Sequence, residues 1–100
     1  MSARIEIPHD RIAEFCQRWR VRKMALFGSV IRDDFTPESD VDVLVEFRIG
    51  WNPGLRFFGE MPDELSQILS RKVDLNTAQD LSPYFRQEVL DEAEVIYDQA

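Results

Sequence analysis

The sequence predicts an α/β (α+β) fold, because segments with helical periodicity alternate with short strands. Four apolar side chains recur at helical spacing between residues 12 and 19. MALFG, residues 24–28, is a continuous apolar run closed by glycine, as in a central strand buried on both faces. Residues 41–47 alternate apolar and polar side chains, as in a strand with one open face. The 100 residues are enough for one domain with a real core, and we assign residues 1–100 to it.

The composition limits the functions that fit this chain. The formal net charge of −7 argues against the phosphate backbone of DNA or RNA as the main partner, so we expect no direct nucleic-acid binding. An acidic surface suits a basic protein partner, or carboxylates that hold a cation. The sequence has no run of 18 apolar residues and no signal-peptide pattern, which predicts a soluble cytoplasmic protein that does not enter a membrane. The lone Cys16 fits a reducing compartment.

The first predicted helix follows Pro8, a residue that suits the first turn of a helix. Cys16 lies in its apolar stripe, so we expect a core residue rather than a reactive thiol. The stripe consists of Ile12, Phe15, Cys16 and Trp19. Residues 18–23, RWRVRK, are predicted to be a solvated connection, with a basic patch for a partner as the alternative.

The strand 24–28 is followed by one or two predicted helical turns from Ser29 to about Asp33, and then by a polar loop over 33–39. The second strand runs from Val41 to Phe47. Its alternation places two sets of side chains on opposite faces. Val41, Val43, Val45 and Phe47 are predicted to face the core, and Asp40, Asp42, Leu44 and Glu46 the open side.

The second half of the chain is predicted to add a helix, a strand and a helix. Residues 48–54 form a loop, and Leu55 to Leu69 a helix that is kinked or restarted at Pro62. Residues 71–77 form a third strand, with Val73 and Leu75 facing one way and Lys72, Asp74 and Asn76 the other. The last helix begins with Ser82 as N-cap and Pro83 at its first position. Its stripe is Phe85, Val89, Ala93 and Ile96, whereas Trp51, Phe57 and Phe58 fit either the core or the wall of a pocket.

Gly28-Ser29 follows a predicted strand and opens a helical turn. Such a turn presents backbone N–H groups and a hydroxyl to an anion, and glycine lets a phosphate approach the main chain. Taken alone, the pair is better explained as a structural turn, because Gly-Ser turns are common and mostly structural.

Two aspartates, Asp40 and Asp42, lie two residues apart on the open face of the second strand. Two carboxylates at this spacing can hold Mg²⁺, which prefers hard oxygen ligands and shares them with substrate phosphates. The alternative is a strand end that simply faces water. If the third strand is a neighbour, Asp74 adds a third carboxylate, and two charges 4 Å apart repel by about 4 kcal/mol at a dielectric of 20. The cluster therefore predicts a site for metal-bound triphosphate.

With Gly28-Ser29, ten intervening residues and Asp40-Val41-Asp42, the chain resembles the DNA polymerase β-type nucleotidyltransferase superfamily. More narrowly, it resembles the MNT-type minimal nucleotidyltransferases. LFGSVIRDDFTPESDVDVLVEF, RKVDLNT and LSPYFRQEVLDEAEVIY carry the match, which runs from about residue 10 to residue 97. The resemblance implies the nucleotidyltransferase fold, a small mixed β-sheet with helices packed mainly on one face.

The resemblance also implies roles for individual residues. Asp40 and Asp42 would hold two Mg²⁺ ions that bind the triphosphate of ATP, the co-substrate. Asp74 would ligate the catalytic metal and help deprotonate the attacking hydroxyl. Gly28 and Ser29 would bind the β- and γ-phosphates, and Arg32 keeps the second arginine of the family loop. The positions of a further arginine and a glycine in that loop hold Val30 and Asp33 instead.

The acceptor is expected on a partner protein, because we find no second domain that could bind one. The resemblance implies a HEPN-domain ribonuclease toxin as partner, in a hetero-oligomer. Some members of the family transfer AMP from ATP to a tyrosine of the toxin. The leading hypothesis is thus a protein adenylyltransferase antitoxin. The alternatives are a non-catalytic module that neutralises its partner by contact alone, and an acidic structural domain with an accidental motif.

Overall fold

The computed structural model describes residues 5–32 and 35–99. Within these ranges, four strands form one sheet in the order β3-β2-β1-β4. The strands are β1 (Val21–Phe27), β2 (Val41–Phe47), β3 (Val73–Asn76) and β4 (Glu94–Asp98). β1 pairs antiparallel with both β2 and β4, whereas β2 and β3 are parallel. The expected mixed sheet is therefore confirmed.

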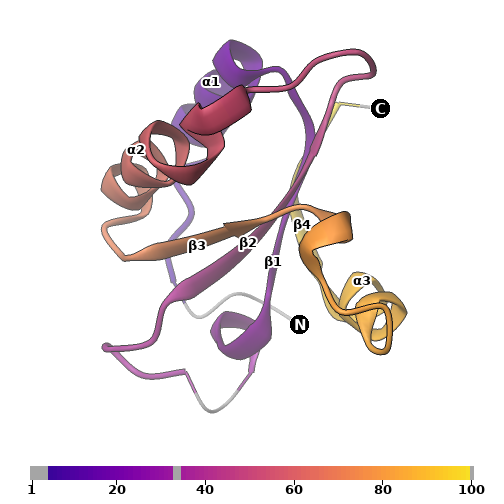
Figure 1. The fold of residues 1–100 in the computed structure, drawn as a ribbon. Helices are drawn as coiled ribbons and strands as arrows, with labels where there is room; N and C mark the ends of the chain where they lie inside the picture. Colours follow the sequence, from indigo (N-terminus) through magenta and orange to yellow (C-terminus); the bar gives the residue numbers. More distant parts are fainter. Residues whose placement is uncertain (1–4, 33–34, 100) are drawn as a thin grey trace.

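Two longer helices cover one face of this sheet, and a shorter helix lies on the other side (Figure 1). The covering helices are α1 (His9–Trp19) and α2 (Glu60–Leu69), and the shorter helix is α3 (Arg86–Glu92). Three 3₁₀ turns complete the described elements: η1 (Gly28–Ile31), η2 (Gly54–Phe58) and η3 (Ala78–Asp80). Because α3 is short, most of the opposite face stays open. This arrangement confirms helices packed mainly on one face.

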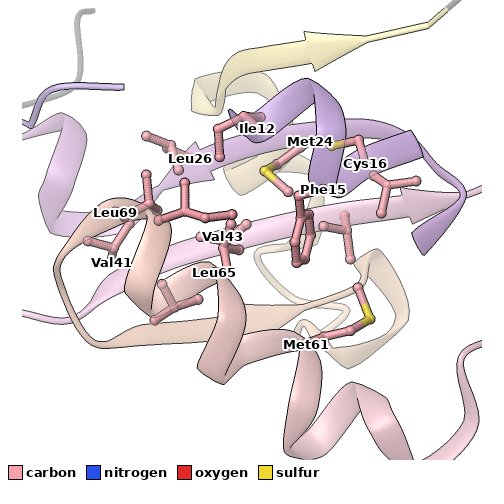
Figure 2. Close-up of a cluster of buried hydrophobic side chains, with 14 of the residues drawn as sticks. Ile12, Phe15, Cys16, Met24, Leu26, Val41, Val43, Met61, Leu65 and Leu69 are labelled. Atoms are coloured by element: carbon pink, nitrogen blue, oxygen red, sulfur yellow. The ribbon is translucent and has the colours of Figure 1, made fainter. Parts of the chain in front are cut away.

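The hydrophobic core fills the space between the sheet and the two covering helices (Figure 2). Most of its fully enclosed side chains come from α1, α2, β1 and β2, among them Ile12, Phe15 and Cys16; Met61 and Leu65; Met24 and Leu26; Val41 and Val43. Removing such side chains from water is the main stabilising contribution to a domain of this size. Burial raises the pKa of the Cys16 thiol to about 12, so Cys16 is an unreactive core residue, as expected.

The strand periodicities are also confirmed. Met24, Ala25 and Leu26 are all buried, as expected for a central strand enclosed on both faces. On β2, Val41, Val43 and Val45 point into the core. The alternate residues Asp42 and Leu44 are only partly buried, so they lie on the open face.

The predicted C-terminal helix is wrong in its second half. Helix α3 ends at Glu92, and Glu94–Asp98 form the edge strand β4 beside β1. The residues of β4 include Val95, Ile96 and Tyr97, types that fit a pleated, half-buried surface, and β1 offers an unpaired edge. Pairing with that edge overrides the helical spacing of the sequence. The start is displaced too, because Phe85 is the N-cap while Ser82 accepts a hydrogen bond from the Tyr84 N–H in the preceding turn.

Residues 18–23 are not a solvated connection. Helix α1 runs to Trp19 and ends at Arg20, whose left-handed conformation (φ 58°) lets its N–H reach the carbonyls of the last turn. β1 then begins at Val21, which is fully buried. A single left-handed residue thus joins helix and strand without a loop.

The helix predicted from Leu55 to Leu69 is two elements. The break lies at Gly59, between η2 and α2, and not at Pro62. Pro62 sits in the first turn of α2, where its missing N–H costs nothing. The third strand is shorter than the predicted 71–77, since only Val73–Asn76 pair with β2.

The sequence left open whether Trp51, Phe57 and Phe58 belong to the core or to the wall of a pocket. Trp51 and Phe57 pack against the edge of the core, whereas Phe58 is 78% exposed. Within the described ranges, no helix has the length and apolar character needed to cross a membrane.

Candidate active site

The site is built on the parallel pair β2–β3. Asp42 and Asp74 are register partners in this pair, so both carboxylates leave the same face of the sheet side by side. The two side chains are in hydrogen-bonding contact, which is one cause of the altered pKa of Asp42. The expectation that the two strands are neighbours is confirmed, and it brings the two carboxylates together.

Asp42 carries the strongest electrostatic signature of the described carboxylates. Its pKa is raised to about 6, first by burial and then by the negative charges of Asp74 and Asp40. The positive charge of Arg32 acts in the opposite direction. Above pH 6 the site therefore holds a partly desolvated negative charge beside other negative charges, and a cation bound there would relieve it.

Gly28 lies directly against the Asp42 carboxylate. A Cβ atom built on Gly28 would stand 2.2 Å from Asp42 Oδ2, and Gly28 has a φ of +76°. Only glycine satisfies both the close approach and the left-handed backbone. The turn η1 and the aspartates therefore form one site, because any side chain on Gly28 would push Asp42 away.

Ser29 and Arg32 flank this contact. Both belong to the loop that begins with η1, and the Arg32 N–H donates to the Ser29 carbonyl at 2.9 Å. The Arg32 guanidinium also donates to Glu92 Oε2 of α3 at 3.2 Å. Val30 is fully buried in the core, so the residue that departs from the family pattern serves packing here. Asp33, the other departure, lies outside the described residues.

Asp40 is exposed and stands immediately before β2. Its charge contributes to the raised pKa of Asp42. Across residues 5–32 and 35–99, however, no group of three His, Cys, Asp or Glu side chains is arranged to hold a metal ion. The structure thus pairs Asp42 with Asp74 and leaves Asp40 nearby but outside a preformed ligand set. The paired carboxylate oxygens are the hard donors that Mg²⁺ prefers, so the donor chemistry fits the expected metal.

Two features of this face were missed in the sequence. One is Glu92, which contacts Arg32 through an ion pair between distant segments. The other is a cavity of about 600 Å³ on the open face, between β1–β2 and α3. Both depend on where α3 packs, and the helical periodicity of 85–96 concealed that. The run of strand-forming residues at 95–97 was the signal that could have found it.

Comparison with protein families gives a match to the nucleotidyltransferase domain over residues 10–96. A putative protein adenylyltransferase of Methanocaldococcus jannaschii is 37% identical over 90 residues, which are 89% of this chain and 86% of that protein. The protein adenylyltransferase MntA of Thermococcus cleftensis is 36% identical over 84 residues, which are 84% of this chain and 81% of that protein.

Solved structures give the same fold. A structure described as a putative minimal nucleotidyltransferase matches with a TM-score of 0.68 and 30% identity over 85% of each chain. A toxin–antitoxin complex with AMP-PNP matches with a TM-score of 0.69 and 20% identity, over 92% of this chain and 74% of that one. A complex of a tri-AMPylated Shewanella oneidensis HEPN toxin with an MNT antitoxin matches with a TM-score of 0.62 and 18% identity, over 90% of this chain and 69% of that one.

Proposed function

Since the chain belongs to the nucleotidyltransferase domain family, we propose that it is a protein adenylyltransferase antitoxin that transfers AMP from ATP to a tyrosine of a HEPN-type toxin. The observation that carries this proposal is the Asp42–Asp74 pair packed against Gly28. A neutral structural role would not require two carboxylates in contact at a position where glycine alone leaves room for them. The protein adenylyltransferase MntA is a relative in sequence, and an MNT antitoxin with the same fold is bound to a tri-AMPylated HEPN toxin.

Asp42 and Asp74 would hold Mg²⁺, with Asp40 joining them when the ion and nucleotide bind. When bound, the metal would neutralise charge on the triphosphate and lower the pKa of the attacking hydroxyl. Gly28 and Ser29 would bind the β- and γ-phosphates through backbone N–H groups and the Ser29 hydroxyl. Arg32 would add a positive charge beside them.

The chemical step is a displacement at the α-phosphorus of ATP. The tyrosyl oxygen forms a bond to this phosphorus, the bond to the oxygen bridging the β-phosphate breaks, and pyrophosphate leaves with the electron pair. A tyrosine hydroxyl has a pKa near 10 and is protonated at neutral pH, so it needs a base. The carboxylate of Asp74 would accept its proton. Binding the two proteins together would supply the proximity that the reaction requires.

The partner would therefore bind this chain in a hetero-oligomer. The formal net charge of −7 favours a basic contact surface on that partner. We also propose a cytoplasmic location, where ATP is available and where a free thiol such as Cys16 stays reduced.

The test is the intact mass of the HEPN-type protein encoded by a neighbouring gene, after incubation with this chain, Mg²⁺ and ATP. The wild-type chain should add adenylate to a tyrosine, and Asp42→Asn should add none. Asp98→Asn, which removes an exposed carboxylate at the end of β4, is the matched control and should keep the activity. If Asp42→Asn still neutralised the toxin fully in cells, contact alone would be the mechanism.

A further inference from the structure

The cavity on the open face lies between the sheet and α3. Its floor includes Ala25 of β1 and Leu44 of β2, and its opposite wall includes Leu90 and Ala93. Val95 of β4 closes one side. These five side chains are apolar, and Leu90 and Val95 remain 39% and 46% exposed. The rest of the lining adds polar side chains, among them Lys23, Glu46 and Gln79. The hollow thus has an apolar floor and wall with polar groups beside them, and the fold leaves it partly open.

The cavity continues the row of functional residues along the strands. Leu44 follows Asp42 by two positions, so both side chains are on the same face of β2. Ala25 is the register partner of Leu44, just as Phe27 is the partner of Asp42. Gly28 follows Phe27 at the end of β1, so it lies beyond Asp42 on the side away from Leu44. Along the open face, the order is therefore the Gly28-Ser29 turn, then the aspartates, then the cavity.

This order has a chemical consequence. In an in-line displacement at phosphorus, the attacking and leaving oxygens lie on opposite sides of the phosphorus. Pyrophosphate would leave toward Gly28 and Ser29, so the attacking oxygen must approach the aspartates from the opposite side. The cavity lies on that side.

We infer that this cavity is the acceptor subsite, and that it receives the tyrosine side chain of the partner protein together with neighbouring apolar residues. The inference rests on the proposed adenylyl transfer and names where its second substrate binds. A tyrosine ring is a large apolar body with a polar tip. Its ring would lie on Ala25 and Leu44, with its hydroxyl directed toward Asp74.

The size and continuation of the cavity fit a protein segment rather than a lone ring. At about 600 Å³ the cavity is larger than a tyrosine side chain needs. A second hollow of about 340 Å³ shares Phe47, Thr77 and Gln79 with it. We expect the residues that flank the acceptor tyrosine to lie in this second hollow, which the exposed Phe58 also lines.

The adenine base is the competing occupant. It is attached to the α-phosphorus through the sugar oxygen, which is neither the attacking nor the leaving group. The nucleoside therefore departs across the reaction axis and not along it. With pyrophosphate leaving toward Gly28 and Ser29, the axis would run along β1 and β2, and the register of these strands puts the cavity residues Ala25 and Leu44 on the far side of Asp42. This favours the acceptor.

The test maps two probes on the ¹⁵N-labelled wild-type chain by NMR. N-acetyl-L-tyrosinamide should shift the amide signals of Ala25, Leu44 and Val95. Mg²⁺ with AMP-PNP should shift those of Gly28 and Ser29 and leave the cavity signals in place. Cavity shifts with AMP-PNP and none with the tyrosine probe would assign the hollow to the base and overturn the inference. Absence of shifts at Gly28 and Ser29 would instead contradict the proposed nucleotide site.

A filling variant gives a second readout. Ala93→Trp should raise the KM for the partner at least tenfold, while the dissociation constant for Mg²⁺–AMP-PNP stays within twofold of wild type. Leu55→Trp, a change at a residue that is 86% exposed and outside the cavity lining, is the matched control. An unchanged KM with active wild-type enzyme would remove the cavity from the reaction and leave the proposed function standing.

Discussion

The two faces of the sheet differ in what their side chains do. On the helix-covered face, Phe15, Val43 and Leu65 are fully enclosed. On the open face, Asp42 is partly buried, and this burial together with the negative charges of Asp74 and Asp40 raises its pKa. Both faces use the same strand, because β2 alternates between them. The apolar face stabilises the domain and fixes the register, and that register places Asp42 beside Asp74 on the other face.

This contrast predicts opposite responses to mutation. A change on the covered face should lower the free energy of unfolding and reduce activity only through loss of folded protein. A change at the aspartates should remove activity and leave the apo protein as stable as before, or more so. Five measurements test this division.

The largest effect is expected on the covered face. Phe15→Ala should lower the free energy of unfolding by about 3–5 kcal/mol, because it opens a cavity among enclosed side chains. Phe58→Ala is the control, since Phe58 is 78% exposed and its loss should cost less than about 0.5 kcal/mol. Urea denaturation measures both. Equal losses for the two variants would contradict the assignment of the core.

The open face should respond to ligand instead. Mg²⁺ with ATP should stabilise the wild-type chain by about 2.7 kcal/mol at a hundredfold excess over the dissociation constant. The cation would stabilise the charged form of Asp42, whose pKa is raised by burial and by the negative charges of Asp74 and Asp40. Thermal melts detect the shift, and Asp74→Asn should abolish most of it. If millimolar Mg²⁺–ATP left the melting temperature of the wild-type chain unchanged, this would argue against the nucleotide site.

The contact between Gly28 and Asp42 joins the turn to the aspartates. Gly28→Ala should lower the free energy of unfolding by about 1–2 kcal/mol for the left-handed backbone alone, and further because the Asp42 carboxylate must move. Gly50→Ala is a matched control, since Gly50 has a φ of +81° and nothing within 4 Å of an added Cβ. The difference between the two variants isolates the contact. Adenylyl transfer should be lost only in Gly28→Ala.

Asp42→Asn should stabilise the apo protein at neutral pH. The pKa of Asp42 rises from 3.8 to about 6 on folding, so the folded chain binds the proton more tightly than the unfolded chain does. Stability therefore falls as pH rises from about 4 to about 6 and stays lower above that. The advantage of Asp42→Asn should grow over the same range to about 1 kcal/mol, after allowance for solvent screening. Urea denaturation between pH 4 and pH 8 tests it, and a variant that unfolds at pH 7 would make Asp42 a structural residue.

The smallest effect concerns Glu92 of α3, whose carboxylate forms an ion pair with Arg32. Its carboxylate is an anion beside the proposed triphosphate site, so Glu92→Gln should bind Mg²⁺–AMP-PNP about twofold more tightly. That factor corresponds to about 0.4 kcal/mol, which is within the usual range for an exposed ion pair. Calorimetric titration measures it, with Glu88→Gln on the same helix as control. Weaker binding in Glu92→Gln would show instead that Glu92 positions Arg32 for the nucleotide.

Much of the fold could be predicted because its elements follow local rules. The stripe of α1, the buried run of β1 and the alternation of β2 each reflect burial that repeats with the period of the element. The pairing of Asp42 with Asp74 followed from that alternation once the two strands were taken as neighbours. Strand β4 was missed because Ile96 continues the helical spacing of Phe85, Val89 and Ala93. The strand-forming residues 95–97 were a competing signal, and pairing with the edge of β1 decides in favour of the strand.

The site could be predicted in part for the same reason. Gly28, Asp42 and Asp74 lie where their strands place them. Asp40 stands outside any strand, so its side chain is not fixed by the sheet, and its role as a metal ligand stays a prediction. The contact of Glu92 with Arg32 and the cavity under α3 depend on packing between distant segments, which no local pattern encodes.

The order β3-β2-β1-β4 makes β3 an outer strand, with one row of backbone groups that no other strand among the described residues pairs. Such a row can recruit a strand from another molecule, and natural sheets discourage this with short edge strands and charged side chains. β3 has four residues, and one of them is Asp74. We therefore expect the carboxylate proposed as catalytic base to discourage self-association of the sheet as well. A variant that neutralises Asp74 loses both properties, so its solution should be checked for aggregates before a loss of activity is assigned to chemistry alone.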